Sequence, residues 1–287
     1  MTTPTIASSL DLPGCRCCAG RVWHARRAFV LAAAGAVALP AVAQVSVGNA
    51  SGMRKLVPAE QLESSATQQY HQLLAQAKAK GALAPDNHPQ LVKLRAIAQR
   101  IIPFATQWNS SAARWRWEVN LIGSKEVNAF CMPGGKIAFY TGILDQLKLT
   151  DDEIAMVMGH EMAHALREHA RSRIAKSQAT SIGLSLGAQL LGLGELGNMA
   201  ANLGTQLLTL QFSRSDETEA DLVGLELAAR AGYNPQAAVS LWRKMGEATG
   251  NGGIGFLSTH PTGPNRIQEL EQNVPRVEGL YQQARRR

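Results

Sequence analysis

Three residues near the middle of the chain have the types and spacing of a catalytic metal site. His160, Glu161 and His164 form the pattern H-E-x-x-H within the stretch VMGHEMAHALREH. Residues four apart lie on one face of a helix, so both imidazoles can reach one ion, and the Glu161 carboxylate can reach a water beside it. Zinc accepts nitrogen and carboxylate donors in tetrahedral geometry and leaves a fourth position for water. We therefore interpret the stretch as a zinc site rather than as a charged helix that happens to contain histidines.

A catalytic zinc needs a third protein ligand, which the motif itself does not supply. The stretch FSRSDETEADLVG, residues 212–224, contains Glu217 and Asp221, again four apart on an expected helix. Glu217 could complete the site, and Asp221 could accept a hydrogen bond from the outer nitrogen of a ligand histidine. The alternative is a solvent-exposed helix start, favoured by the helix dipole and formed by Asp216, Glu217, Glu219 and Asp221. His169 lies five residues after His164, roughly 140° further around a continuous helix, and is expected to point elsewhere.

Four ordered segments resemble the gluzincin metallopeptidase family that includes the CAAX prenyl protease, HtpX, BepA and LoiP. HEMAH is paired with SRSDETEAD, the hairpin VNAFCMPGG precedes the motif and STHPTGPNRI follows it, so the resemblance runs from about Leu91 to Leu270. In that family the first glutamate of the E-x-x-x-D spacing binds zinc. The resemblance therefore implies Glu217 rather than Glu219 as the third ligand, one Zn²⁺ per chain, and the activity of a zinc metalloendopeptidase with Glu161 as general base.

The same resemblance implies roles for two further segments. His260, in STHP, would either donate a hydrogen bond to the oxyanion or occupy the open zinc position and hold the enzyme inactive; an ordinary loop histidine is the alternative. Asn128, Ala129 and Phe130 would lie on an edge strand beside the zinc, where an extended substrate adds through main-chain hydrogen bonds, unless they form an ordinary hairpin. That binding mode reads backbone more than side chains, so unfolded or misfolded envelope proteins are the expected substrates.

The expected function is quality control in the bacterial cell envelope. A competing hypothesis is a chaperone-like assembly factor for outer-membrane proteins, in contact with the assembly machinery, whose protease activity is latched off. A third is a membrane-surface protein that uses Ser177 to Leu210, which has six glycines and one charged residue. We expect that segment to form two glycine-flanked helices that are buried or cap a cleft.

The first 43 residues have the pattern of a signal peptide for export to the periplasm. The stretch from Arg21 to Arg27 is basic, Phe29 to Val42 is apolar but shorter than the ~20 residues of a membrane span, and Ala41-Val42-Ala43 is a cleavage pattern. Arg26-Arg27 resembles a twin-arginine signal, and general secretion stays open. No cysteine follows the junction, so the lipid anchor of LoiP is not expected.

Composition excludes nucleic acid as a partner. The net charge is +7, and the first 43 residues carry four arginines and one aspartate, so about +4 remains for the rest, without a basic run interleaved with aromatics. Three of the four cysteines lie before the apolar run. The fourth, Cys131, is expected to be a small core residue rather than a reactive thiol.

The elements that must position the site indicate one mostly helical α+β domain of the zincin type, with a small antiparallel sheet, over residues 58–287 after a flexible leader at 44–57. Alternation predicts a strand at Arg114 to Ile122, and Pro133-Gly134-Gly135 predicts a hairpin between two short strands. A capping box at Thr150 to Glu153 opens a helix expected to continue to about Lys176. Further helices are expected at 58–80, from 89 toward 108, and at 214–231, 235–249 and 264–274, with a loop at 250–263.

Overall fold

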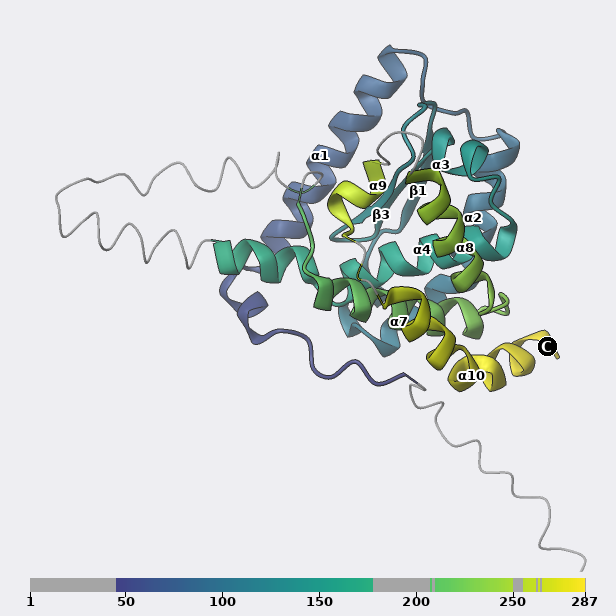
Figure 1. Ribbon diagram of the computed structural model, residues 1–287. Helices are drawn as coiled ribbons and strands as arrows, with labels where there is room; N and C mark the ends of the chain where they lie inside the picture. The colour runs from purple at the N-terminus through teal and green to yellow at the C-terminus, as the bar shows by residue number, and fades with distance from the viewer. Residues whose placement is uncertain are drawn as a thin grey trace, which may run out of the picture. The chain divides into compact units, whose positions relative to one another are not determined.

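The computed structural model describes residues 45–177, Leu207, 210–249, 255–261, 263 and 265–286. The expected signal peptide and most of the glycine-rich segment lie outside these described residues. Within them the chain is mostly helical with one small sheet, which confirms the α+β fold class (Figure 1).

The sheet contains three strands in the order β1-β3-β2: β1 (Glu118–Ile122), β2 (Ala129–Met132) and β3 (Lys136–Tyr140). β2 and β3 form the expected antiparallel hairpin, in which Gly134 and Gly135 adopt φ of 83° and 77°. β1 pairs with β3 in parallel, so the sheet is mixed and the prediction of a purely antiparallel sheet was wrong. Residues 114–117, expected to start β1, instead belong to the end of a 3₁₀ helix (Ser110–Arg114) and a short connection.

Helix α4 (Asp151–Leu166) forms the centre of the domain. The Thr150 hydroxyl accepts the backbone amide of Glu153, whose carboxylate accepts the amide of Thr150, which is the expected capping box. From Glu153 onward every residue of α4 is buried. One face packs against β2, and the other packs against α7 (Arg214–Arg230), which runs beside α4 in Figure 1.

The remaining helices enclose this pair. α1 (Ala59–Ala79) contacts β2 and β3, α2 (Pro89–Ile101) contacts α4, and α8 (Ala237–Thr249) contacts α4. α10 (Arg266–Arg285) packs along α7; it continues well beyond the expected end near residue 274, with Pro275 inside it. Two short helices were not expected from the sequence: α3 (Thr141–Gln146) and α9 (Gly255–Thr259).

Helix α4 is shorter than expected. It ends at Leu166, and Glu168 adopts a positive φ of 57°, after which residues 169–177 are again helical. This break redirects the chain directly after the H-E-x-x-H motif. The single helix predicted through Lys176 is therefore two helical segments separated by a turn at residues 167–168.

Residues 45–57, expected to form a flexible leader, pack against the domain. Val45 is buried, and its backbone amide donates to Glu226 of α7 at 3.0 Å. Arg54 forms an ion pair with Glu168 at 2.8 Å, just after α4. Residues 45–57 are thus held against the domain by these contacts and do not form the flexible leader expected from the sequence.

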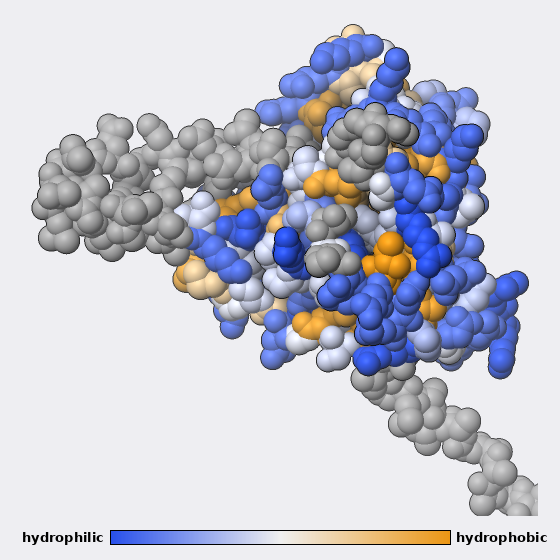
Figure 2. Space-filling view, viewed as in Figure 1, coloured by the Kyte–Doolittle hydropathy of each residue, from blue (hydrophilic) through white to orange (hydrophobic). Residues whose placement is uncertain are grey.

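The face of the described part shown in Figure 2 is mainly hydrophilic, and the apolar side chains on it form small separate patches. Among the described residues only Leu56 and Val92 are large apolar side chains with high exposure. None of the helices described is both long and apolar enough to span a bilayer.

Candidate metal centre

The three predicted ligands converge although Glu217 lies more than fifty residues from the histidines in sequence. Nε2 of His160 lies 3.1 Å from Nε2 of His164. Oxygens of Glu217 lie 3.5 Å from His160 Nε2 and 3.3 Å from His164 Nε2. Donor atoms about 2 Å from a tetrahedral zinc lie about 3.3 Å from one another, so this spacing fits one small ion.

Nε2 of His260 faces the same group. One donor atom from each of His160, His164, Glu217 and His260 lies within 4.8 Å of the other three, and all four residues are buried. His260 belongs to the stretch after α9, where its backbone amide donates to the carbonyl of Phe256. The expected 250–263 loop is therefore folded in part into a helix that directs this imidazole at the motif.

Polar atoms without hydrogen-bond partners mark the place where a cation fits. Oε1 of Glu217, Oε1 of Glu161 and Nε2 of His260 are buried and make no well-formed hydrogen bond within the described part of the chain, and Oε2 of Glu217 has only the ion pair with Arg266. Leaving such groups unpaired in a protein interior costs free energy. A metal ion bound by Glu217 and the imidazoles would satisfy most of them, and neutral nitrogen with carboxylate donors is the set that zinc prefers.

The protonation states of the histidines also suit a metal. Burial lowers the pKa of His160, although its hydrogen bond to Asp221 opposes this. Burial, together with the neighbouring imidazoles, lowers the pKa of His164 well below its ordinary value. Both rings are therefore neutral near pH 7, as a metal-ligating imidazole must be.

Burial raises the pKa of Glu217 to about 8, although the Arg266 guanidinium opposes this shift. A carboxyl group in this position takes up a proton unless further positive charge is near. A divalent cation among His160, His164 and Glu217 would supply that charge and hold the carboxylate ionised.

Asp221 holds His160 as expected. The Nδ1–H of His160 donates to Oδ1 of Asp221 at 2.9 Å, which leaves Nε2 for the metal. Burial would raise the pKa of Asp221, but Arg266 and the hydrogen bond from His160 outweigh it and lower that pKa. The alternative of a solvent-exposed acidic helix start is thus wrong for Glu217 and Asp221, which are 3% and 7% exposed.

Arg266 was missed in the sequence. Its guanidinium bridges two acidic side chains of α7, at 2.6 Å from Asp221 Oδ2 and 3.0 Å from Glu217 Oε2. It is stacked over the ring of Trp242, with 3.3 Å between its Cζ and the ring centroid. The signal lay in the segment STHPTGPNRI, but nothing in the spacing showed that a residue at the start of α10 would return to α7.

Glu161 lies on the open side of the group. Its Oε1 is 3.3 Å from Nε2 of His260. Burial and the nearby Glu217 carboxylate raise the pKa of Glu161 well above its ordinary value, although a backbone hydrogen bond from Cys131 opposes them. A carboxyl group with a raised pKa beside a metal position can accept a proton and later return it.

Residues 91–274 match the model of peptidase family M48. The chain belongs to peptidase family M48. Its relatives include the mitochondrial metalloendopeptidase OMA1 of Schizosaccharomyces pombe, 37% identical over 68% of this chain and 56% of that protein. The metalloprotease LoiP of Escherichia coli is 27% identical over 68% of this chain and 75% of its own. The beta-barrel assembly-enhancing protease of Yersinia pestis is 26% identical over 58% of this chain and 36% of its own.

The matched region of this M48 chain spans about half the length of the fungal relative and 31% of the OMA1 protein of Arabidopsis thaliana. Family membership confirms the resemblance seen in the motifs. It also agrees with the pairing of the H-E-x-x-H helix with the Glu217 helix, which the structure shows directly.

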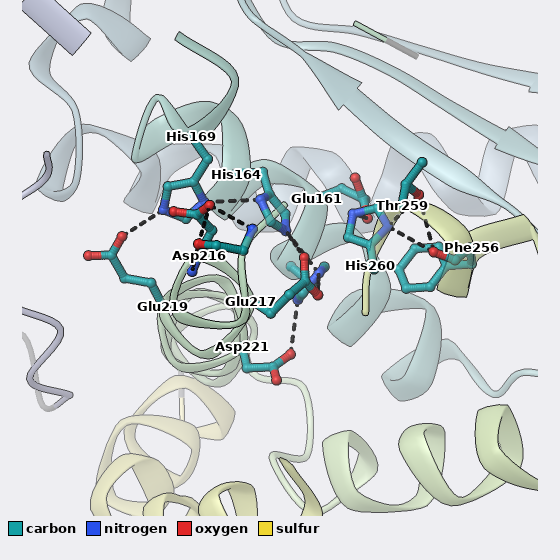
Figure 3. Close-up of polar contacts among 12 residues, drawn as sticks. Glu161, His164, His169, Asp216, Glu217, Glu219, Asp221, Phe256, Thr259 and His260 are labelled. Atoms are coloured by element: carbon teal, nitrogen blue, oxygen red, sulfur yellow. Dashed lines mark hydrogen bonds and ion pairs between the residues drawn. The ribbon is translucent and has the colours of Figure 1, made fainter. Parts of the chain in front are cut away.

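His169 corrects one expectation from the sequence. It does not belong to the four-residue group, but it does not point away either: its Nδ1 lies 3.0 Å from Nδ1 of His164 (Figure 3). The 140° argument assumed a continuous helix. Because α4 ends at Leu166 and Glu168 adopts a positive φ, His169 turns back toward the motif.

A cleft of about 280 Å³ opens beside the M48 motif. Its walls include Glu161, His164 and His260 on one side and Asn128, Phe130 and Cys131 of the hairpin on the other. β2 lies at one margin of the sheet and pairs with β3, so its second edge faces this cleft. Ala129 is fully buried, and its backbone amide already donates a hydrogen bond to Oδ1 of Asn128 at 2.9 Å.

Cys131 is buried within β2, and burial raises the pKa of its thiol well above the ordinary value. The thiol is therefore protonated near neutral pH. It contributes to the cleft wall as a small apolar group, in line with the expected role.

Proposed function

We propose that this chain is a zinc-dependent endopeptidase of the bacterial cell envelope that hydrolyses peptide bonds of unfolded or misassembled proteins. The observation that carries the proposal is the buried convergence of His160, His164 and Glu217, with Glu161 beside them at the wall of a cleft. Membership in a peptidase family and the printed names of the relatives support the reaction type.

Zinc would be held by Nε2 of His160, Nε2 of His164 and the Glu217 carboxylate. When bound, it would acidify a water and polarise the scissile carbonyl. The family uses a metal, and the donor set described above fits zinc better than the oxygen-preferring ions magnesium and calcium.

Glu161 is proposed as the general base and then the general acid. It lies one residue after His160 on α4, so its carboxyl group is fixed beside the ligands by the helix itself. Its raised pKa suits both roles, because the group can take a proton from the attacking water and give it to the leaving amine.

His260 is proposed as an inhibitory ligand rather than as an oxyanion donor. Its Nδ1 lies 3.1 Å from the carbonyl oxygen of Phe256, and a carbonyl only accepts, so the proton of the neutral ring is on Nδ1. The Nε2 atom that faces the ligands then carries a lone pair. Burial lowers the pKa of His260 well below its ordinary value, which disfavours the imidazolium that a donor role would require.

The hairpin is proposed to bind substrate. Asn128 and Phe130 line the cleft, and one edge of β2 pairs with none of the strands described, so an extended peptide could add there as a further strand beside Glu161. Ala129 would contribute through its backbone carbonyl, because its amide is already bonded to Asn128. Backbone pairing selects chains that can become extended, which favours unfolded proteins over tightly folded ones.

The envelope location rests on the sequence pattern of residues 1–43, which lie outside the described residues. Among the relatives, LoiP and the beta-barrel assembly-enhancing protease come from bacteria, whereas the OMA1 proteins are named as mitochondrial. The compartment is therefore inferred from the signal-peptide pattern of residues 1–43, and the reaction is inferred from the candidate metal centre.

A second candidate function is a chaperone-like assembly factor for outer-membrane proteins with latched protease activity. The position of a His260 ring nitrogen within 4.8 Å of the three proposed ligand atoms favours it, because a fourth protein ligand would displace the catalytic water.

One experiment separates the two. Zinc content and casein cleavage are measured for the wild type, Glu161→Gln and His260→Ala, with Glu247→Gln, at an exposed position of α8, as the matched control. The protease hypothesis predicts zinc in all four and loss of cleavage in Glu161→Gln alone. Loss of cleavage in His260→Ala as well would contradict the inhibitory role proposed for His260 and would support an oxyanion donor. An inactive wild type that becomes active as His260→Ala supports the latch. Absence of zinc from every variant, or equal cleavage by Glu161→Gln, contradicts the mechanism.

A further inference from the structure

Both ligand histidines have a carboxylate behind them, but in different ways. His160 donates directly to Asp221 at 2.9 Å. Behind His164 lies His169, with 3.0 Å between the two Nδ1 atoms, and the Nε2 of His169 lies 2.6 Å from Oε2 of Glu219 (Figure 3). His164 thus reaches a carboxylate through an intervening imidazole.

The geometry determines where the protons lie. Nε2 of His164 faces the ligand group, so its Nδ1 carries the proton and donates to Nδ1 of His169. His169 must then carry its own proton on Nε2, which donates to the Glu219 carboxylate. A carboxylate only accepts, and this fixes the direction of the whole chain of hydrogen bonds.

The far end of this chain is anchored. Glu219 stands on α7 two residues after Glu217, and its second oxygen forms an ion pair with Arg167. The same guanidinium donates to the carbonyl of Gly48 at 2.9 Å, in the segment that packs before α1. Two donors, His169 and Arg167, thus hold the two oxygens of the Glu219 carboxylate in place.

From these contacts we infer that His169 and Glu219 are positioning residues that fix the tautomer and ring orientation of His164 for zinc binding. The inference rests on the proposed function, since it assumes that His164 is a zinc ligand. Ligand histidines are supported by such outer hydrogen bonds, and their loss costs about 10- to 100-fold in metal affinity. The acidic residues at the start of α7 then have different roles. Asp216 takes part in the capping box, and Glu217 faces the proposed zinc position. Asp221 holds His160 directly, and Glu219 holds His164 through His169.

The test measures zinc affinity by competition with a chromogenic chelator, and separately the melting temperature of the zinc-free protein. His169→Phe keeps the ring shape but removes the acceptor, and we expect zinc affinity to fall about 10- to 100-fold. His169→Asn can place its Oδ1 near the former Nδ1, so it should retain more affinity than the phenylalanine variant. The matched control is His71→Phe, which removes an exposed histidine of α1 that also lies beside a carboxylate, that of Glu118. It should leave the zinc affinity unchanged.

A double-mutant cycle tests whether Glu219 acts through His169. Glu219→Gln alone should weaken zinc binding by a smaller factor, but it should add little to His169→Phe, because the contact it supports is already gone. If His169 and Glu219 only pack, the variants should lower the melting temperature of the zinc-free protein and leave its zinc affinity unchanged. If the two substitutions weaken zinc binding independently, so that their effects add, the proposal that Glu219 acts through His169 is wrong.

The outcomes distinguish this inference from the proposed function. A wild type that binds no zinc, or binds it as well after His164→Ala, contradicts the zinc site itself. A wild type that loses zinc with His164→Ala but binds it equally well with His169→Phe contradicts only the positioning role.

Discussion

Gly159 of α4 and Gly224 of α7 lie directly against each other. A Cβ atom on Gly159 would lie 2.7 Å from the carbonyl oxygen of Gly224, and one on Gly224 would lie 2.6 Å from the backbone nitrogen of His160. No side chain fits between the helices at this crossing. The close approach brings the Glu217 carboxylate within 3.5 Å of both ligand imidazoles.

Gly224→Ala should therefore separate the two helices and loosen the metal site. We expect a loss of about 1 to 3 kcal/mol in the free energy of unfolding, as for other overpacked cores, together with weaker zinc binding. Chemical denaturation of the zinc-free protein and chelator competition measure the two effects. Gly279→Ala in α10, where a Cβ meets nothing within 4 Å, should be neutral or stabilising; similar losses in both variants would refute the packing argument.

Acid should reveal the ion pair at the start of α4. Burial would raise the pKa of Glu153, but hydrogen bonds from Lys244, Thr150 and Ser240 outweigh it and lower that pKa below its ordinary value. A carboxyl with a lowered pKa in the folded state adds stability above its unfolded pKa, and this stability is lost as the pH falls through the folded value.

Lys244→Gln should accordingly lower the free energy of unfolding at pH 7 by about 1 kcal/mol, a modest amount because the lysine is partly exposed. The loss should become smaller as the pH falls below about 4 and Glu153 takes up a proton. Urea unfolding at several pH values checks this. Arg243→Gln, which breaks a more exposed pair with Glu271, is the control. A stability difference for Lys244→Gln that is constant from pH 7 to pH 3 would be inconsistent with the pair.

Part of this site could be predicted from the sequence, because it depends on residues that lie within a few positions of one another in the chain. His160, Glu161 and His164 follow from helical spacing, and the Thr150 capping box follows from four residues. Glu217 needed information that spacing did not contain, namely that α7 crosses α4 at two glycines. The family resemblance supplied it.

The residues that were missed depend on chain reversals. His169 supports His164 because the helix breaks at Glu168, a non-glycine residue with a positive φ that no local pattern marked. Arg266 lies in the helix expected after residue 264, but nothing in the local pattern showed that its side chain would reach α7. His260 was predicted from the family resemblance, whereas the short helix α9 that precedes it was expected to be a loop. The parallel pairing of β1 with β3 likewise depends on a crossover that the hairpin signal could not show.

Removal of the metal should destabilise the fold. Without a cation, several buried groups, including Oε1 of Glu217, lack hydrogen-bond partners among the residues described. Zinc at about a thousand times its dissociation constant should add about 4 kcal/mol to the free energy of unfolding. Thermal melts with and without a chelator should therefore differ for the wild type and coincide for Glu217→Ala; an equal zinc effect in both proteins would exclude Glu217 as a ligand.

The most direct test of the proposed metal centre is an anomalous difference map, recorded at the zinc absorption edge from crystals grown with zinc. We expect one peak about 2 Å from Nε2 of His160, Nε2 of His164 and a carboxylate oxygen of Glu217. A peak elsewhere, or a zinc ion bound by the histidines with the Glu217 side chain turned away from it, would contradict the proposed metal centre.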